Sequence, residues 1–177
     1  MTIEQPGSGA PITLRDGRAV HIRAIRTSDE AELLQAFDRL SPEARYMRFM
    51  RVVKAPNLER LRRTLAGFPQ TGDAVVATIP AADGIDIVGS ATFIILEGQR
   101  DCEFAINVAS SFGGAGLGRI LMQSLIDAAR ARGLERMEGF VLAVNQPMLA
   151  LASRLGFSID RDPEDPSVRI CRLSLQG

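Results

Sequence analysis

A run of glycines that joins a strand pattern to a helix pattern constrains this sequence more than any other feature. In residues 102–108 apolar side chains occupy every second position, which is the period of a β-strand. In residues 117–133 apolar or small side chains recur every three or four positions, which predicts an amphipathic helix. The glycines at this junction are Gly113, Gly114, Gly116 and Gly118. We therefore expect the chain to pass from a strand into a helix through a glycine loop.

A glycine loop at the start of a helix is a typical binding site for an anion. The first backbone N–H groups of a helix have no partner within the helix, and the helix dipole is positive at that end. Glycines allow several N–H groups to converge, because no side chain keeps a ligand away. Arg119 adds a positive charge in the first turn. The sequence thus predicts a phosphate or pyrophosphate site, with a glycine-rich connector that binds nothing as the alternative.

Two common nucleotide-binding patterns do not fit this loop. A P-loop requires a lysine and then a hydroxyl residue after its last glycine, where this chain has Arg119 and Ile120. A dinucleotide-binding fingerprint requires a third glycine where Arg119 stands, and it belongs to a βαβ unit that this chain lacks. The sequence therefore gives poor support to magnesium-nucleotide and dinucleotide chemistry.

Strand and helix patterns follow one another in an order typical of a mixed α+β fold. Residues 1–11 are predicted to be a flexible lead, and residues 12–177 a single domain. A capping box of Thr27 and Glu30 is expected to start the first helix. We expect that helix to bury Leu33, Leu34, Phe37 and Leu40. Strands are predicted at 12–14, 19–25, 74–79, 87–96, 102–108, 137–144, 157–159 and 168–175, and helices at 27–40, from 41, from 57, at 117–133 and at 145–155.

Composition excludes several classes of function. The chain of 177 residues has 21 basic and 21 acidic side chains, so neither nucleic acid nor an acidic membrane is an expected partner. No apolar run is long enough to span a bilayer, and no signal sequence is seen. Cys102 and Cys171 do not make a disulfide framework, so we expect a reducing cytoplasm. With His21 as its single histidine, the chain is expected to hold no metal and to use no histidine-based catalysis.

The glycine loop resembles motif A of the GNAT acetyltransferases, Gln/Arg-x-x-Gly-x-Gly/Ala, with Gly116 and Gly118 at its glycines. Asn145 and the helix that ends in Leu-Gly-Phe at residues 155–157 resemble a later motif of that family. The resemblance runs from about residue 12 onward and implies the GNAT fold, a mixed, mostly antiparallel sheet flanked by helices. The segments similar to the catalytic domain of bacterial protein-lysine acetyltransferases are 14–17, 22–26, 40–49 and 103–105.

The resemblance implies that acetyl-CoA is the co-substrate. In the family, the loop amides hold its pyrophosphate, while Ile106, Val108 and Asn145 bind the pantetheine arm, the first two as if it were an added strand. Gly113 and Ala115 stand where the family often has Gln or Arg and a basic residue, so the loop keeps the backbone cradle but loses side-chain contacts. The implied cofactor-binding residues are Ile106, Val108, Gly113, Gly114, Ala115, Gly116, Leu117, Gly118, Arg119, Asn145 and Met148.

Acetylation of an amine requires a general base, because a lysine amine of pKa about 10.4 is almost entirely protonated at neutral pH. Glu103 points to the opposite face of its strand from Phe104, and it matches the catalytic Glu of the family. Apolar neighbours would raise its pKa by desolvation, which suits a base. An exposed strand carboxylate without a catalytic role is the alternative.

The leaving thiolate could be protonated by one of two groups or could leave without a proton. Many GNAT members have a general-acid Tyr at the position of Ala152, so here the proton would have to come from water or from Ser153, if one is needed. A thiolate of pKa about 8.5 is able to leave without protonation. Cys102 points with the apolar set, so direct transfer is favoured over an acyl-enzyme.

The leading functional hypothesis is direct acetyl transfer to a protein lysine, for example on an acyl-CoA synthetase. A small-molecule amine acceptor and a non-catalytic acyl-CoA-binding module are the alternatives. A chain of 177 residues is expected to hold a lone catalytic domain, without the acyl-CoA-synthetase-like or cyclic-nucleotide-binding domain that is often attached in the family. No particular oligomeric state is predicted.

Overall fold

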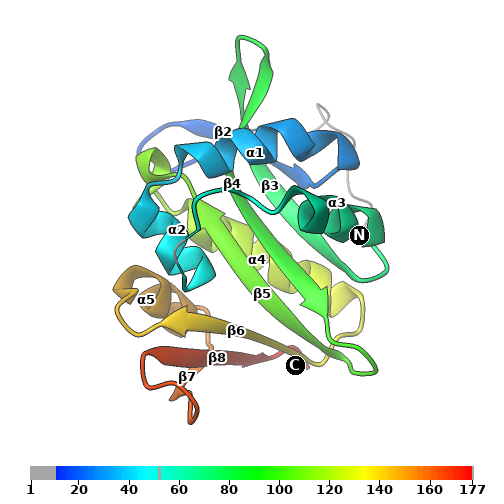
Figure 1. Cartoon of the computed structure of the whole chain (residues 1–177), viewed down its shortest axis with the longest axis vertical. Coiled ribbons are helices and arrows are strands. Elements are labelled where there is room, and N and C mark those ends of the chain that lie inside the picture. Colours follow the sequence, from blue (N-terminus) through cyan, green and yellow to red (C-terminus); the bar gives the residue numbers. More distant parts are fainter. Residues whose placement is uncertain (1–10, 52, 177) are drawn as a thin grey trace.

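A computed structural model describes residues 11–51 and 53–176, so residues 1–10 of the predicted lead lie outside it. The chain forms one eight-stranded sheet in the order β1-β2-β3-β4-β5-β6-β8-β7 (Figure 1). Neighbouring strands are antiparallel except β5 and β6, which are parallel. The strands are β1 Ile12–Thr13, β2 Ala19–Ala24, β3 Gly72–Ala81, β4 Gly84–Ile95, β5 Asp101–Val108, β6 Arg136–Leu142, β7 Ser158–Arg161 and β8 Val168–Ser174.

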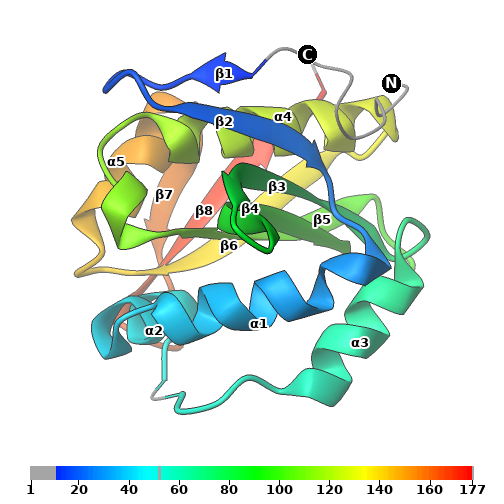
Figure 2. The ribbon, with the colours of Figure 1, turned by 90° about the horizontal axis from the view of Figure 1, so that it is seen from above.

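Helices cover both faces of this sheet. Helices α1, α2 and α3 lie on one face, and α4 with α5 on the other (Figure 2). This arrangement confirms the predicted α+β fold with a mostly antiparallel sheet. The helices are α1 Glu30–Arg39, α2 Pro42–Phe49, α3 Leu58–Gly67, α4 Leu117–Ala131 and α5 Gln146–Arg154, with short 3₁₀ turns at Thr27–Asp29 and Ser110–Phe112.

Helix α4 forms the centre of the core. Its buried face follows the three-and-four spacing of the sequence, and this face packs against β3, β4 and β5. The close approach of α4 to β4 needs Gly89, because a Cβ there would lie 2.8 Å from Leu121 Cδ1. Burying a large aliphatic side chain contributes about 1.5–3 kcal/mol. The fully buried side chains of α4 are Leu117, Leu121, Met122, Leu125 and Ile126.

Strands β5 and β6 separate soon after they begin. They pair only at three positions, the last being Glu103 opposite Glu138, and then diverge (Figure 1). The ring of Phe104 fills the space just past this point, 5.2 Å from the ring centre of Phe157. A Cβ at Gly139 would lie 2.7 Å from Phe104 Cδ1 and closer still to two other ring carbons. The strands are thus held apart by a wedge, and a cavity opens beyond it.

The start of the first helix differs from the expected capping box. Glu30 does not cap Thr27; instead the Asp29 carboxylate accepts a hydrogen bond of 2.8 Å from the Arg26 N–H. The same carboxylate binds Arg23 through two hydrogen bonds of 2.7 and 2.8 Å. The turn therefore begins one residue earlier than predicted, at Arg26, and Asp29 replaces Glu30 as the acidic residue of the cap.

The apolar face of α1 is also less buried than expected. Phe37 is buried, but Leu33, Leu34 and Leu40 are only partly covered. These three leucines line a cavity between the helices and the sheet instead of joining the core.

Candidate active site

The glycine loop has the geometry of an anion cradle. Gly114 and Gly116 have φ of 74° and 91°, in the left-handed region that favours glycine, whereas Gly113 has an ordinary φ of −65°. Helix α4 begins directly after Gly116. Within the described chain, the six consecutive backbone N–H groups of residues 114–119 make no hydrogen bond to a protein acceptor. They are therefore available to a bound anion.

Arg15, from the turn between β1 and β2, lies against this loop. Its backbone N–H donates to Ala115 O at 3.2 Å, and its Nη2 donates to Gly114 O at 3.3 Å. A Cβ at Gly116 would lie 3.2 Å from Arg15 Nε, so the glycine also makes room for the guanidinium. Arg15 brings a positive charge to a loop that lacks the family's usual basic side chains. Sequence reasoning missed it, because about a hundred residues separate it from the loop.

The edge of β5 that faces β6 is free beyond Glu103. Asp101 O accepts a hydrogen bond from the Leu96 N–H, and the Ala109 N–H donates to Val88 O. Because the direction of the backbone groups alternates along a strand, the odd-numbered residues from 101 to 109 direct their N–H and C=O groups to β4. The N–H and C=O groups of Ile106 and Val108 therefore point toward the opening. This is the edge that the sequence predicts as an acceptor for an added strand.

A cavity of about 990 Å³ joins the loop and this free edge. All eleven predicted cofactor-binding residues lie around it, although Ala115 and Leu117 bury their side chains and offer only backbone. Asn145 caps α5, with its Oδ1 accepting from the Met148 N–H at 3.4 Å, which leaves its amide N–H groups free to donate. The contacts of these residues with acetyl-CoA stay predictions.

Glu103 lies where this cavity meets a second one. The second cavity measures about 1090 Å³ and is formed by α1, α2, α3 and β4. Glu103 lines both cavities. Burial and the neighbouring Glu138 raise the pKa of Glu103, and Arg48 and Arg60 oppose that rise. Its predicted role as a base stays a prediction, but its position between two cavities suits it.

The side chains considered for other chemical roles lie elsewhere. Cys102 is fully buried, its Sγ lies 3.6 Å from Arg136 O, and burial raises its pKa to about 12, so it is a poor nucleophile. Ala152 is buried in the core. Among the described residues, the cavity linings include neither Ser153 nor Tyr46, the only tyrosine of the chain. The structure therefore gives no support to Ser153 as a proton donor to the thiolate, which leaves water or departure without a proton.

Two further properties concern residues 11–51 and 53–176 as a whole. In those ranges no three His, Cys, Asp or Glu side chains gather as a set of metal ligands. Nor does any helix there combine the length and the apolar character that crossing a bilayer requires.

Comparison with known proteins identifies the class that this fold and cleft define. The Acetyltransferase (GNAT) family model matches residues 34–157, and the chain belongs to that family. Acetyltransferase PA5475 of Pseudomonas aeruginosa is 34% identical over 163 residues, covering 92% of this chain and 88% of that protein. The chain is therefore a GNAT acetyltransferase, an enzyme that uses acetyl-CoA.

Solved structures share the fold. The GNAT domain of S. lividans PAT superposes with a TM-score of 0.84 at 22% identity, covering 97% of this chain and 99% of that one. YncA of Salmonella typhimurium, solved with its cofactor acetyl-CoA, gives a TM-score of 0.66 at 21% identity, covering 89% and 95% of the two chains. At these identities the likeness extends to the fold alone.

Proposed function

We propose that this acetyltransferase transfers the acetyl group directly to the side-chain amine of a protein lysine, for example on an acyl-CoA synthetase. The observation that carries the proposal is the position of Glu103, which lies at the junction of two cavities. One cavity has the anion cradle and the free strand edge, and the other is open to an acceptor. A carboxylate at that junction contacts both reactants.

The first cavity fits acetyl-CoA through groups of this chain. The N–H groups of residues 114–119 would bind the pyrophosphate, with Arg15 and Arg119 balancing its charge. The free edge at Ile106 and Val108 would hydrogen-bond the pantetheine amides, and Asn145 would donate to the same arm. Bound acetyl-CoA supplies an activated thioester at the end of that arm.

Glu103 would take the proton of the acceptor ammonium, directly or through one water, which leaves a neutral amine to attack the thioester carbonyl. The C–N bond forms, the C–S bond breaks, and the thiolate of coenzyme A leaves. No acid is required of the protein, because a thiolate of pKa about 8.5 is a competent leaving group. The high pKa of Cys102 supports transfer without a covalent acetyl-enzyme.

The second cavity supports a polypeptide acceptor. Its volume exceeds the space that a single lysine side chain needs, so the surrounding chain also has room. Ile94 is a large apolar side chain at this lining that remains exposed. The resemblance of residues 40–49 and 103–105 to protein-lysine acetyltransferases agrees with this acceptor.

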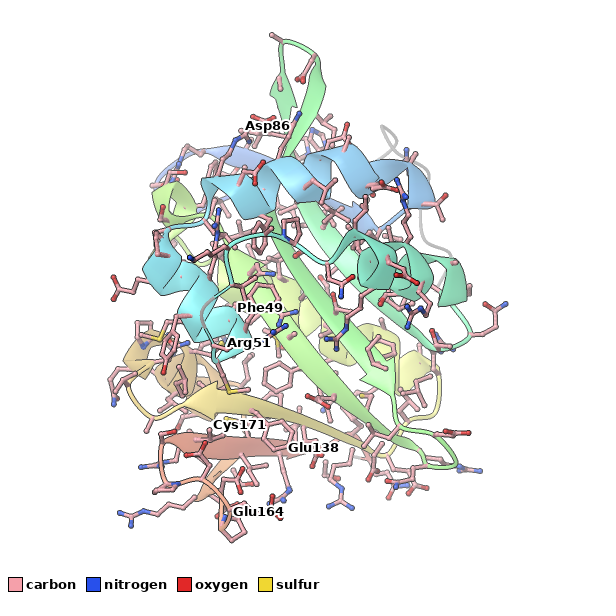
Figure 3. All side chains as sticks on the ribbon, in the orientation of Figure 1. Phe49, Arg51, Asp86, Glu138, Glu164 and Cys171 are labelled. Carbon is pink, nitrogen blue, oxygen red and sulfur yellow. The ribbon has the colours of Figure 1, made fainter. Side chains whose placement is uncertain are left out.

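The test is transfer from isotope-labelled acetyl-CoA into a cell extract free of lysine acetylation, separated into protein and small-molecule fractions. Label on protein lysines that falls at least 100-fold in Glu103→Gln is the expected result. Glu164→Gln is the matched control, because Glu164 is an exposed carboxylate that lines neither cavity and lies in the loop beyond β7, at the lower edge of Figure 3. It should keep wild-type activity.

The other outcomes identify the alternatives. Label confined to small molecules would indicate a metabolite amine as acceptor. Unchanged protein labelling in Glu103→Gln would show that the base assignment is wrong. Binding of acetyl-CoA without any transfer would favour a non-catalytic module.

A further inference from the structure

Positive charge exceeds negative charge around the second cavity. Its lining holds five cationic side chains but only two acidic ones, Asp86 and Glu103. Arg39 pairs with Asp86, with 3.2 Å between Nη1 and Oδ2, so these two charges cancel. Glu103 then remains as the single described carboxylate of the lining against four cations. In the described part of the chain these four, Arg48, Arg51, Lys54 and Arg60, form no ion pair.

Arg48 is the most constrained of these cations. It lines both cavities, as Glu103 does. Its Nε is buried and has no hydrogen-bond partner among the described residues. Its guanidinium carbon lies 4.7 Å from the ring centre of Phe49, which fixes its position at the end of α2 (Figure 3 labels Phe49). Burial and the nearby Arg60 both lower the pKa of Arg48. A buried cationic donor without an acceptor is costly, so an anionic oxygen here would be bound favourably.

Pairing with Glu103 does not account for these cations. Among the described residues, no salt bridge joins Arg48 or Arg60 to the Glu103 carboxylate, although Glu103 raises the pKa of Arg48 from a longer distance. Both arginines lower the pKa of Glu103, which works against its role as a base. Their charge is therefore left for the substrate.

We propose that the acceptor carries an anionic oxygen group, such as a carboxylate, close to its reacting amine, and that Arg48 and Arg60 bind this group while Glu103 receives the proton. The inference rests on the proposed amine acetylation at Glu103. Two sources offer this chemistry, an acidic side chain next to a lysine in a polypeptide and the free carboxylate of an amino acid. Binding the anion also orients the amine toward the junction of the cavities.

Two matched pairs of acceptors test the proposal with the full chain and acetyl-CoA. The first pair is a short peptide with glutamates on both sides of one lysine and the same peptide with glutamines. The second pair is Nα-acetyl-lysine and its carboxamide, which differ only in the carboxylate. We expect kcat/KM to be at least tenfold higher for the anionic member of one pair. The pair that responds identifies the source of the anion.

Variants connect that preference to the two arginines. Arg48→Gln and Arg60→Gln should each reduce the anionic-to-neutral ratio of kcat/KM toward one. Using the ratio removes any effect of these changes on the base, because Glu103 serves both acceptors alike. Arg63→Gln is the matched control, since Arg63 lies on the same helix as Arg60, is 73% exposed, pairs with Glu59 and lines neither cavity. Arg60→Gln keeps the test valid where Arg48→Gln fails to fold.

Two results would overturn the inference. Equal kcat/KM for both members of both pairs, in the presence of transfer, would refute the anionic acceptor and leave the proposed function intact. The anionic-to-neutral ratio of kcat/KM could also stay the same in Arg48→Gln, Arg60→Gln and Arg63→Gln. That result would show that groups other than these arginines bind the anionic group of the acceptor. Absence of transfer both to all four acceptors and to the protein lysines of the cell extract would instead refute the proposed function, and the inference with it.

Discussion

Charges around Glu103 act on it in opposite directions. Glu138 is its direct neighbour across the parallel pair of β5 and β6, so the two carboxylates share one face of the sheet. Arg172 lies 3.4 Å from Glu138 and partly offsets that charge. On the other side, Arg48 and Arg60 favour the ionised form of Glu103. The pKa of Glu103 is therefore set by burial and by three charged neighbours on three elements, Glu138 of β6, Arg48 of α2 and Arg60 of α3.

The pH dependence of kcat/KM should report this balance. The base must be ionised to act, so a raised pKa moves the acidic limb of the profile to higher pH. Glu138→Gln removes a charge that raises the Glu103 pKa and should move this limb to lower pH, by roughly half a unit. Arg60→Gln should move it to higher pH, measured with a neutral acceptor. Shifts of the same sign in both variants would contradict the assignment of the limb to Glu103.

Arg15 compensates for the missing basic side chains of the glycine loop. Arg15→Gln should weaken acetyl-CoA binding by about tenfold, because it removes one charge beside six free N–H groups. Isothermal titration measures the dissociation constant. Arg161→Gln, an exposed position at the end of β7, should leave it unchanged. Acetylated pantetheine, which lacks the pyrophosphate, should bind the wild type and Arg15→Gln alike.

At the scale of elements, the divergence of β5 and β6 creates the cleft. The ring of Phe104 holds the strands apart, and Gly139 leaves space for that ring. The wedge combines a bulky residue on one strand with the absence of a side chain on the other. Neither residue alone reveals it in the sequence.

Gly139→Ala should destabilise the protein by about 1–3 kcal/mol, since its methyl group would overlap the Phe104 ring in a packed core. Urea unfolding monitored by circular dichroism measures the free energy. The double variant Gly139→Ala with Phe104→Leu should lose less than the sum of the two single changes, because the smaller side chain gives way. Strict additivity would show that the two residues do not share this space.

The sequence predicts elements that depend on local patterns, but it does not predict contacts between segments far apart in the chain. The strand at 102–108 and the helix from 117 agree with β5 and α4 to within two residues, because both depend on periodic burial within one segment. The parallel pairing of β5 with β6 and the position of Arg48 near Glu103 depend on segments more than thirty residues apart. The capping box at Thr27 was wrong for a different, local reason, because the turn starts one residue earlier, at Arg26, and Asp29 takes the place predicted for Glu30.

For the whole molecule, a buried ion pair joins strand β2 to the short 3₁₀ turn that precedes α1. Asp29 is 4% exposed and binds Arg23 of β2 at 2.7 Å. Burial raises the pKa of Asp29, but the hydrogen bonds from Arg23 and the Arg26 N–H outweigh this and hold the pKa below its ordinary value. The pair therefore stabilises the fold through an ionised aspartate.

Asp29→Asn should destabilise the protein by about 3–5 kcal/mol, because it leaves a buried guanidinium without its counter-charge. The folded-state pKa is the lower one, so the contribution is complete above the unfolded value of about 3.8 and is lost as the pH falls through the folded pKa. Thermal unfolding at pH 7 and pH 3 should show the loss relative to wild type shrinking in acid. Asp16→Asn, in an exposed pair with Arg18, should change stability little at either pH.

The two cavities that meet at Glu103 also determine the order of events in turnover. Both cysteine thiols, Cys102 and Cys171, are buried and have raised pKa values, so neither suits a covalent acetyl-enzyme that would remain after coenzyme A departs. Donor and acceptor must therefore occupy their cavities together in a ternary complex. Initial-rate plots should intersect instead of running parallel, and labelled coenzyme A should not exchange into acetyl-CoA until an acceptor is supplied.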